Sequence, residues 1–262
     1  MPVVELPTSP LAGGAPVSID YQRQGAGPAL VFLHGGWGYD IYPIDLDTLA
    51  ARATVLVPRR SGYGRSTPLA ALPPDFHRCA VLETLAVLDQ LGIERAVWWG
   101  HSDGAVIAAM AALTAPDRVQ AVIVEALHLY AEKAGSRSFF EQMAFDPGRF
   151  GDEVRRVLAA EHGTDRWETV LRLDGVAWLD LARDAASPTA DFYGGRLGQI
   201  GCPTLVLHGG RDPRSEPGEL EAIIRALPEA TVAVYPDAGH SPHSQHGSRD
   251  AVTAAVLSFL DG

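Results

Sequence analysis

Short apolar runs alternate with longer segments of helical periodicity along most of the chain. Continuous apolar runs of this length are typical of strands buried on both faces of a parallel sheet. Strands are predicted at Pro16–Arg23, Ala29–Leu33, Thr54–Val57, Ala96–Trp99, Val119–Val124, Thr204–His208 and Thr231–Tyr235. Helices are predicted between them, at Leu46–Ala53, Asp75–Leu91, Asp103–Thr114, Glu216–Ala226 and Gln245–Leu260. This alternation predicts an α/β fold with a mostly parallel, doubly wound sheet.

The region from residue 127 to residue 200 departs from the alternation. It contains no convincing strand, is rich in aromatic residues, and has helical patterns at Asp152–His162 and Thr164–Arg183. Ligands of open α/β sheets bind at the carboxyl ends of the strands. We therefore predict an α/β core from residues 1–126 and 201–262, and a helical cap over the strand ends from residues 127–200. Most of the cap aromatics are expected to pack, while Trp167 and Trp178 are predicted to contact substrate.

Composition and charge narrow the choice of partners. The 262 residues are 47% hydrophobic and carry a net charge of −11, which predicts a globular protein that binds neither nucleic acid nor an anionic membrane. No apolar run approaches the ~20 residues of a membrane span, and no signal peptide is visible, so a cytoplasmic location is expected. Cys79 and Cys202 are expected to be reduced thiols, and no metal or cofactor is predicted. The expected partner is a small-molecule substrate, bound by a monomer or a homodimer.

Candidate chemistry begins at Gly100-His101-Ser102-Asp103-Gly104. This G-x-S-x-G pattern lies between a predicted strand and a predicted helix, where two glycines allow the chain to reverse sharply and expose the serine hydroxyl. The pattern alone is common, but the strand–turn–helix context is specific. Ser102 is therefore the candidate nucleophile.

A serine hydroxyl needs a base, and the base needs an acid that orients it. His240 lies in a glycine-containing loop after the last predicted strand, and Asp212 directly follows the strand before it. The chain order Ser102, Asp212, His240 is one of the known orders of a serine–histidine–acid triad. The alternatives that stay open are His243 and His246 for the base and Glu125 for the acid.

The glycine-rich turn from His34 to Gly38 follows the second predicted strand. Such a turn can direct a backbone N–H toward a developing oxyanion, with a second donor at the residue after the nucleophile. We predict an oxyanion hole formed by the amides of Gly36 and Asp103. Trp37 could replace Gly36 as the donor and is also a predicted substrate contact, whereas His34 is expected to hold the loop.

Taken together, these motifs resemble the α/β-hydrolase superfamily with a helical cap. The resemblance rests on HGGWG at His34, RRSGYGRS at Arg59, GHSDG at Gly100, HGGRDP at His208 and DAGH at Asp237, and it covers nearly the whole chain. It implies the α/β-hydrolase fold and a hydrolytic reaction. A serine nucleophile argues against the haloalkane dehalogenases and epoxide hydrolases of similar shape. The RRSGYGRS segment departs from the family pattern because Pro58 and Arg59 replace a position that is often acidic.

Asp103 is the most specific clue to the substrate. A carboxylate at a helix N-terminus is favoured by the helix dipole, which explains it without a functional role. The Ser-Asp-Gly sequence also resembles the biphenyl-hydrolase-like, valacyclovir-cleaving esterases, which implies a partner for a substrate ammonium group. In this chain Ala105 replaces the second glycine of that family's pattern.

The residues together predict a serine hydrolase that cleaves a small-molecule carboxylic ester through an acyl-enzyme intermediate. The same triad would also serve a carbon–carbon bond hydrolase, a lactonase, a thioesterase or a proline-type aminopeptidase. A ligand-binding, receptor-like protein that retains the triad is the alternative of another class.

Overall fold

The computed structural model describes residues 2–262 and contains an eight-stranded sheet in the order β1-β2-β4-β3-β5-β6-β7-β8. From β4 to β8 all neighbouring strands pair in parallel, while β1 and β2 are antiparallel to their neighbours. The strands are β1 (Val3–Leu6), β2 (Val17–Gln24), β3 (Ala29–Leu33), β4 (Thr54–Pro58), β5 (Ala96–His101), β6 (Val119–Glu125), β7 (Thr204–Gly209) and β8 (Thr231–Tyr235). The predicted mostly parallel sheet is confirmed.

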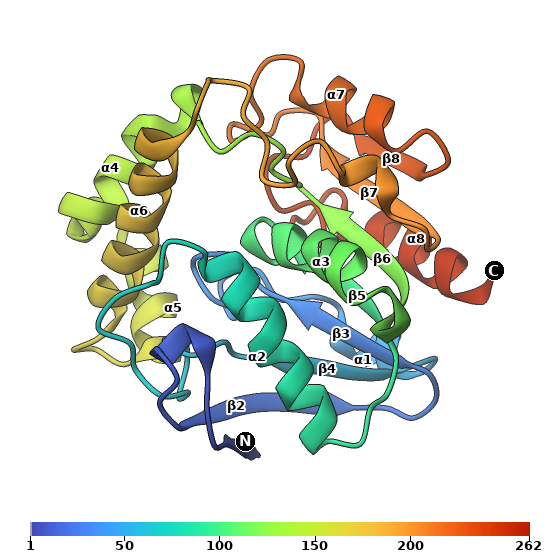
Figure 1. Ribbon diagram of the computed structural model, residues 1–262, viewed down its shortest axis with the longest axis horizontal. Helices are drawn as coiled ribbons and strands as arrows, with labels where there is room; N and C mark the ends of the chain where they lie inside the picture. The colour runs from blue at the N-terminus through green and yellow to red at the C-terminus, as the bar shows by residue number, and fades with distance from the viewer. Residues whose placement is uncertain (1) are drawn as a thin grey trace.

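Helices cover both faces of this sheet (Figure 1). They are α1 (Leu46–Ala50), α2 (Phe76–Gln90), α3 (Asp103–Thr114), α4 (Arg137–Phe145), α5 (Asp152–His162), α6 (Trp167–Asp184), α7 (Glu219–Ala226) and α8 (Arg249–Asp261). Alternate residues of β3 belong to two separate apolar clusters. Val31 and Leu33 pack with α2, α3 and α7, whereas Leu30 and Phe32 pack with α1 and α8. The sheet is therefore doubly wound, which explains why its strands read as continuous apolar runs.

Two elements were not predicted from the sequence. The strand β1 has only four residues and pairs with β2 at the edge of the sheet. The helix α4 packs against α6, and both belong to the region between β6 and β7. We call α4, α5 and α6 the inserted helices; in Figure 1 they lie together at the left of the molecule, beside the sheet.

The inserted helices have a small apolar core of their own. Its buried members are Phe140, Met143, Leu158, Trp167, Leu171 and Trp178. Trp167 lies in this core and is 5% exposed. The expectation that most aromatics of this region pack against one another fits this arrangement.

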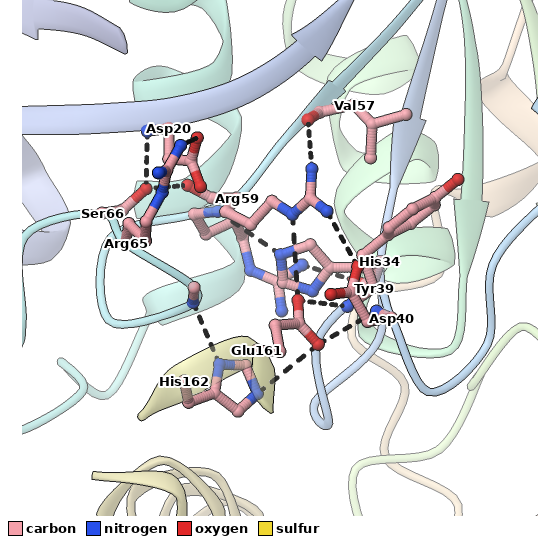
Figure 2. A network of polar contacts seen from close by, with 12 residues as sticks. Asp20, His34, Tyr39, Asp40, Val57, Arg59, Arg65, Ser66, Glu161 and His162 are labelled. Carbon is pink, nitrogen blue, oxygen red and sulfur yellow. Dashed lines mark hydrogen bonds and ion pairs between the residues drawn. The ribbon is translucent and has the colours of Figure 1, made fainter. Parts of the chain in front are cut away.

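The last two residues of α5 join the inserted helices to the loop that follows β3 (Figure 2). The Glu161 carboxyl accepts the backbone N–H groups of Tyr39 and Asp40, both at 2.9 Å. The Nδ1 atom of His162 accepts the N–H of Gly64 (3.0 Å). Its Nε2 donates to the Trp37 carbonyl (3.0 Å), in the loop after β3.

Arg59 completes this junction from the end of β4. Its guanidinium lies 3.0 Å from Asp40 and 3.8 Å from Glu161, and its side chain is 1% exposed. The arginine at the position that is often acidic in RRSGYGRS-like segments therefore lies between a carboxyl group of the loop and one of the inserted helices.

Candidate active site

Ser102 lies in a sharp turn between β5 and α3. Its backbone angles, φ 57° and ψ −119°, are rare for a residue with a side chain and carry strain. The turn is so tight that a β-carbon at Gly100 would clash with the Gly104 carbonyl, and one at Gly104 with the Leu33 carbonyl. Both glycines of the G-x-S-x-G pattern are therefore required sterically, and the turn presents the serine at the carboxyl edge of the sheet.

The structure brings Ser102, His240 and Asp212 into one hydrogen-bonded chain. The Ser102 Oγ lies 3.0 Å from His240 Nε2, and His240 Nδ1 lies 2.9 Å from both carboxylate oxygens of Asp212. Burial alone would raise the pKa of Asp212, but the charge and hydrogen bond of His240 outweigh it and hold that pKa at about 2. The ionised carboxylate places the His240 proton on Nδ1, so Nε2 is free to accept the serine proton.

The alternative acid and bases lie elsewhere. Glu125 accepts two hydrogen bonds from His243, one from Nδ1 at 2.8 Å and one from the backbone N–H at 2.9 Å. His243 Nε2 donates to the Tyr42 carbonyl at 2.8 Å. Although burial alone would lower the pKa of His243, Glu125 raises it above its ordinary value. His246 is exposed on the surface. Glu125 and His243 thus form a separate buried ion pair, and none of the three residues hydrogen-bonds to Ser102.

The loop after β3 passes beside the nucleophile. A β-carbon at Gly35 would lie 3.1 Å from that of Ser102. Within residues 2–262, the backbone N–H groups of Gly36, Trp37 and Asp103 make no hydrogen bond. His34 bonds through Nδ1 to the Gly35 carbonyl at 2.8 Å and so helps to hold the loop. The structure therefore leaves amide donors free in the loop after β3 and at the residue that follows Ser102.

A cavity of about 90 Å³ opens above Ser102. Its walls come from the loop after β3, from the turn at Ser102, and from α4 and α6, with Trp37, Phe139, Phe140, Met143 and Trp178 as apolar lining. Trp37 and Trp178 thus lie where the sequence placed substrate contacts. Trp167 is not part of the lining, because it faces the core of the inserted helices.

The Asp103 carboxylate is buried beneath this cavity. Its Oδ1 accepts hydrogen bonds from His77 Nε2 (3.1 Å) and Trp178 Nε1 (3.0 Å), and its Oδ2 lies 3.9 Å from Arg60. His77, through its hydrogen bond and its charge, and Arg60, through its charge, outweigh the effect of burial and lower the pKa of Asp103. Burial and the adjacent Asp103 charge raise the pKa of Asp174, on α6, well above its ordinary range. The pKa values of the two carboxyl groups at the floor of the cavity are thus shifted in opposite directions, which favours a proton on Asp174 over one on Asp103.

His128 also reaches the nucleophile, and the sequence analysis did not identify it. Its Nε2 lies 3.3 Å from the Ser102 Oγ, and its ring stacks on His240 with centroids 5.6 Å apart. Burial lowers the pKa of His128 well below its ordinary value, so the ring is neutral. Because the serine proton points to His240, His128 donates from Nε2 to the Oγ. The sequence feature that could have identified His128 is its position just beyond β6, the strand that pairs with β5, at the predicted start of the cap.

Residues 2–262 contain neither a metal-ion cluster nor a membrane-spanning helix. No group of three or more His, Cys, Asp or Glu side chains there is arranged to hold a metal ion. No helix among those residues has the length and apolar character needed to cross a membrane.

Comparison with known proteins places this geometry in a family. Serine hydrolase BPHL of Mus musculus is 25% identical over 93% of this chain and 83% of its own. Pimeloyl-[acyl-carrier protein] methyl ester esterase of Pectobacterium atrosepticum is 30% identical over 91% of this chain and 97% of its own. The solved structure of 2-hydroxy-6-oxo-6-phenylhexa-2,4-dienoate hydrolase from Rhodococcus sp. strain RHA1 superposes with a TM-score of 0.72 at 19% identity, covering 100% and 99% of the two chains.

Residues 30–255 match the alpha/beta hydrolase family as a whole. The match spans the sheet from β3 to β8, the serine turn and the inserted helices. The chain belongs to the alpha/beta hydrolase family and is a hydrolase.

Proposed function

We propose that this hydrolase cleaves a small-molecule carboxylic ester through a covalent acyl-enzyme on Ser102. The observation that carries the proposal is the chain from the Ser102 Oγ through His240 to Asp212 at the floor of a cavity. The imidazole Nε2 at 3.0 Å is within reach of the serine proton, and the Asp212 carboxylate behind it stabilises the imidazolium that forms.

In the proposed reaction, Ser102 attacks the ester carbonyl while His240 Nε2 takes its proton. The amides of Gly36 and Asp103 bind the oxyanion of the tetrahedral intermediate. His240 then returns the proton to the leaving alcohol, and the acyl group stays on Ser102. A water molecule, deprotonated by His240, releases the acid and restores the serine.

His128 assists the first step, because its Nε2–H donates to the oxygen that becomes the nucleophile. A neutral donor at 3.3 Å favours the alkoxide character that develops as the proton leaves. His128 cannot itself take the serine proton in this tautomer. It therefore complements His240 rather than replacing it.

Residues 127–200 act in this proposal as a cap that selects the substrate. The inserted helices supply the apolar wall of the cavity through α4 and α6, and a volume of about 90 Å³ suits a small acyl group. One relative is named as a serine hydrolase and another as a methyl ester esterase, which supports ester chemistry on this triad. Trp37 and Trp178 are the proposed apolar contacts.

The test is labelling by a fluorophosphonate probe together with hydrolysis of short 4-nitrophenyl esters. The wild type is expected to label at one residue, located to Ser102 by peptide mass analysis, and to turn over the esters. Ser102→Ala removes both activities while thermal unfolding stays unchanged. Ser187→Ala is the matched control, because Ser187 is an exposed serine remote from the cavity lining. A receptor-like protein would neither label nor hydrolyse, and that outcome would overturn the proposal.

A further inference from the structure

Arg214 extends the cavity wall beyond the triad. It follows Asp212 by two residues, and its backbone N–H donates to Asp212 Oδ1 at 2.8 Å. Its guanidinium carbon lies 3.4 Å from the centroid of the Phe139 ring on α4. The residue is thus held at its backbone by the carboxylate that orients His240, and its side chain spans from the β7–α7 loop to the inserted helices.

Within residues 2–262, no carboxylate forms an ion pair with the guanidinium of Arg214, although the Asp212 charge offsets part of the effect of burial on its pKa. Across the same residues, the guanidinium nitrogen atoms make no hydrogen bond. Arg214 is half-buried, and two fully buried arginines differ from it: Arg59 pairs with Asp40 at 3.0 Å, and Arg60 donates to the His34 carbonyl. Burial lowers the pKa of Arg214, which shows that its charge is partly removed from water. The Phe139 ring offsets part of that cost, but a ring face does not satisfy five N–H donors.

Two carboxylates of the segment from β7 to α7 are already committed to other partners. Asp212 accepts from His240, and Glu219 is bound to the buried amino group of Lys133. The N–H donors of the Arg214 guanidinium are therefore available to a ligand that enters the cavity. A guanidinium presents paired donors that match a carboxylate.

We propose that Arg214 binds a carboxylate of the substrate, so that the ester cleaved at Ser102 carries an anionic group remote from the scissile carbonyl. The inference rests on the proposed ester hydrolysis and defines its substrate class. One guanidinium balances one negative charge, which favours a monocarboxylate over a phosphate dianion in a protein of net charge −11. The apolar rings of Trp37 and Phe139 line the cavity that holds both Ser102 and Arg214, and they suit a short hydrocarbon spacer.

The test compares two esters of equal acyl length, 4-nitrophenyl hemiglutarate and 4-nitrophenyl pentanoate. For Arg214→Gln, the ratio of kcat/KM for the anionic ester to that for the neutral ester is expected to fall at least tenfold. A charge-assisted hydrogen bond of ~1.5–3 kcal/mol corresponds to roughly ten- to a hundredfold. Arg214→Lys keeps the charge and is expected to retain part of the preference.

Arg211→Gln is the matched control. Arg211 lies in the same loop, is 71% exposed at its side chain and pairs with Asp237 on the surface, so its loss removes an equal charge without touching the cavity. For Arg211→Gln, the ratio of kcat/KM for the anionic ester to that for the neutral ester is expected to equal that of the wild type. A ratio unchanged in Arg214→Gln, or lowered equally in both variants, would overturn the carboxylate site.

Failure of the inference and failure of the proposed function are distinguishable. If fluorophosphonate labels the wild type and the ratio does not change, only the role of Arg214 is wrong. If the wild type is not labelled, ester hydrolysis is wrong, and titration calorimetry with monomethyl glutarate still tests Arg214. At least tenfold weaker binding to Arg214→Gln than to the wild type would support the site, and equal affinity or no binding to the wild type would refute it.

Discussion

When the chain folds at mildly acidic pH, a proton moves from His162 to Glu161. As a result, two large and opposite effects of pH on the free energy of unfolding nearly cancel. Burial and the Asp40 carboxylate raise the pKa of Glu161 from 4.5 to about 7. Burial lowers the pKa of His162 from 6.5 to about 4. Near pH 5.5 the unfolded pair holds its proton on the histidine, and the folded pair holds it on the glutamate. The number of bound protons barely changes, so the pair contributes little net pH dependence.

Each residue alone would have a large effect. The difference between folded and unfolded pKa values, about 2.5 pH units for each, corresponds to roughly 3.4 kcal/mol. The raised pKa of Glu161 stabilises the fold below pH 4.5, and that contribution is lost as the pH rises through 7. The lowered pKa of His162 destabilises the fold below pH 4, and that penalty disappears as the pH rises through 6.5. The two contributions cancel to within about 1 kcal/mol.

Urea unfolding of Glu161→Gln and His162→Gln between pH 4.5 and 7 separates the two contributions. Relative to the wild type, the unfolding free energy of His162→Gln is expected to fall by about 2–3 kcal/mol as the pH rises, and that of Glu161→Gln to rise by about the same amount. Subtracting the wild-type values removes the contributions of other titrating groups. A hydrogen bond lost through either substitution shifts the whole curve without changing its slope. Flat differences in both variants would refute the proton exchange.

Four further predictions concern the cavity. Asp212→Asn is expected to lower kcat by about 10⁴, because it disturbs the tautomer of its histidine partner, and intact ester turnover would contradict this. His128→Phe should slow fluorophosphonate labelling by about three- to tenfold while His128→Gln restores a donor, and equal rates in the two variants would exclude a donor role. Trp178→Ala should change the ratio of kcat/KM between short and long acyl esters, whereas Trp167→Ala should lower Tm, by the loss of ~3–5 kcal/mol, without changing that ratio. Asp103→Asn should abolish any preference for an α-amino ester over its des-amino analogue, and equal ratios in both proteins would leave the carboxylate a structural role.

The sheet was predictable because a doubly wound fold imposes a strong signal on its strands. Strands β3 and β8 and helices α3 and α5 have the bounds that the sequence pattern predicts, and the other predicted elements differ by a few residues at their ends. The strand β1 escaped because a four-residue edge strand owes its pairing to β2 rather than to a pattern of its own. The helix α4 escaped because its nine residues are stabilised by packing against α6, and tertiary contacts of this kind leave little periodic signal.

The three hydrogen-bonded residues Ser102, Asp212 and His240 were predictable because each lies in the turn or loop that follows a parallel strand. Parallel strands end at one edge of a sheet, so residues that follow different strands meet there. His128, Asp174 and Arg214 were not predicted. They reach the cavity through the cap boundary, α6 and the β7–α7 loop, and their side-chain positions depend on how these segments pack together.

The loop after β3 links the inserted helices to the proposed chemistry. It carries the Gly36 amide that we assign to the oxyanion, and the next residues are bound by α5: His162 donates to the Trp37 carbonyl at 3.0 Å, and Glu161 accepts the amide of Tyr39. No residue of α5 lines the cavity, whereas α4 and α6 both do.

The inserted helices therefore divide their roles. In the proposed function, side chains of α4 and α6 line the site of the acyl group, so they can change to suit another acyl group with little effect on the loop. A change at the end of α5 would instead move the loop and, with it, a donor to the oxyanion, so that kcat would change before substrate preference did. Variation in substrate specificity is accordingly expected on α4 and α6, while the acid and histidine that end α5 are constrained by the loop they hold.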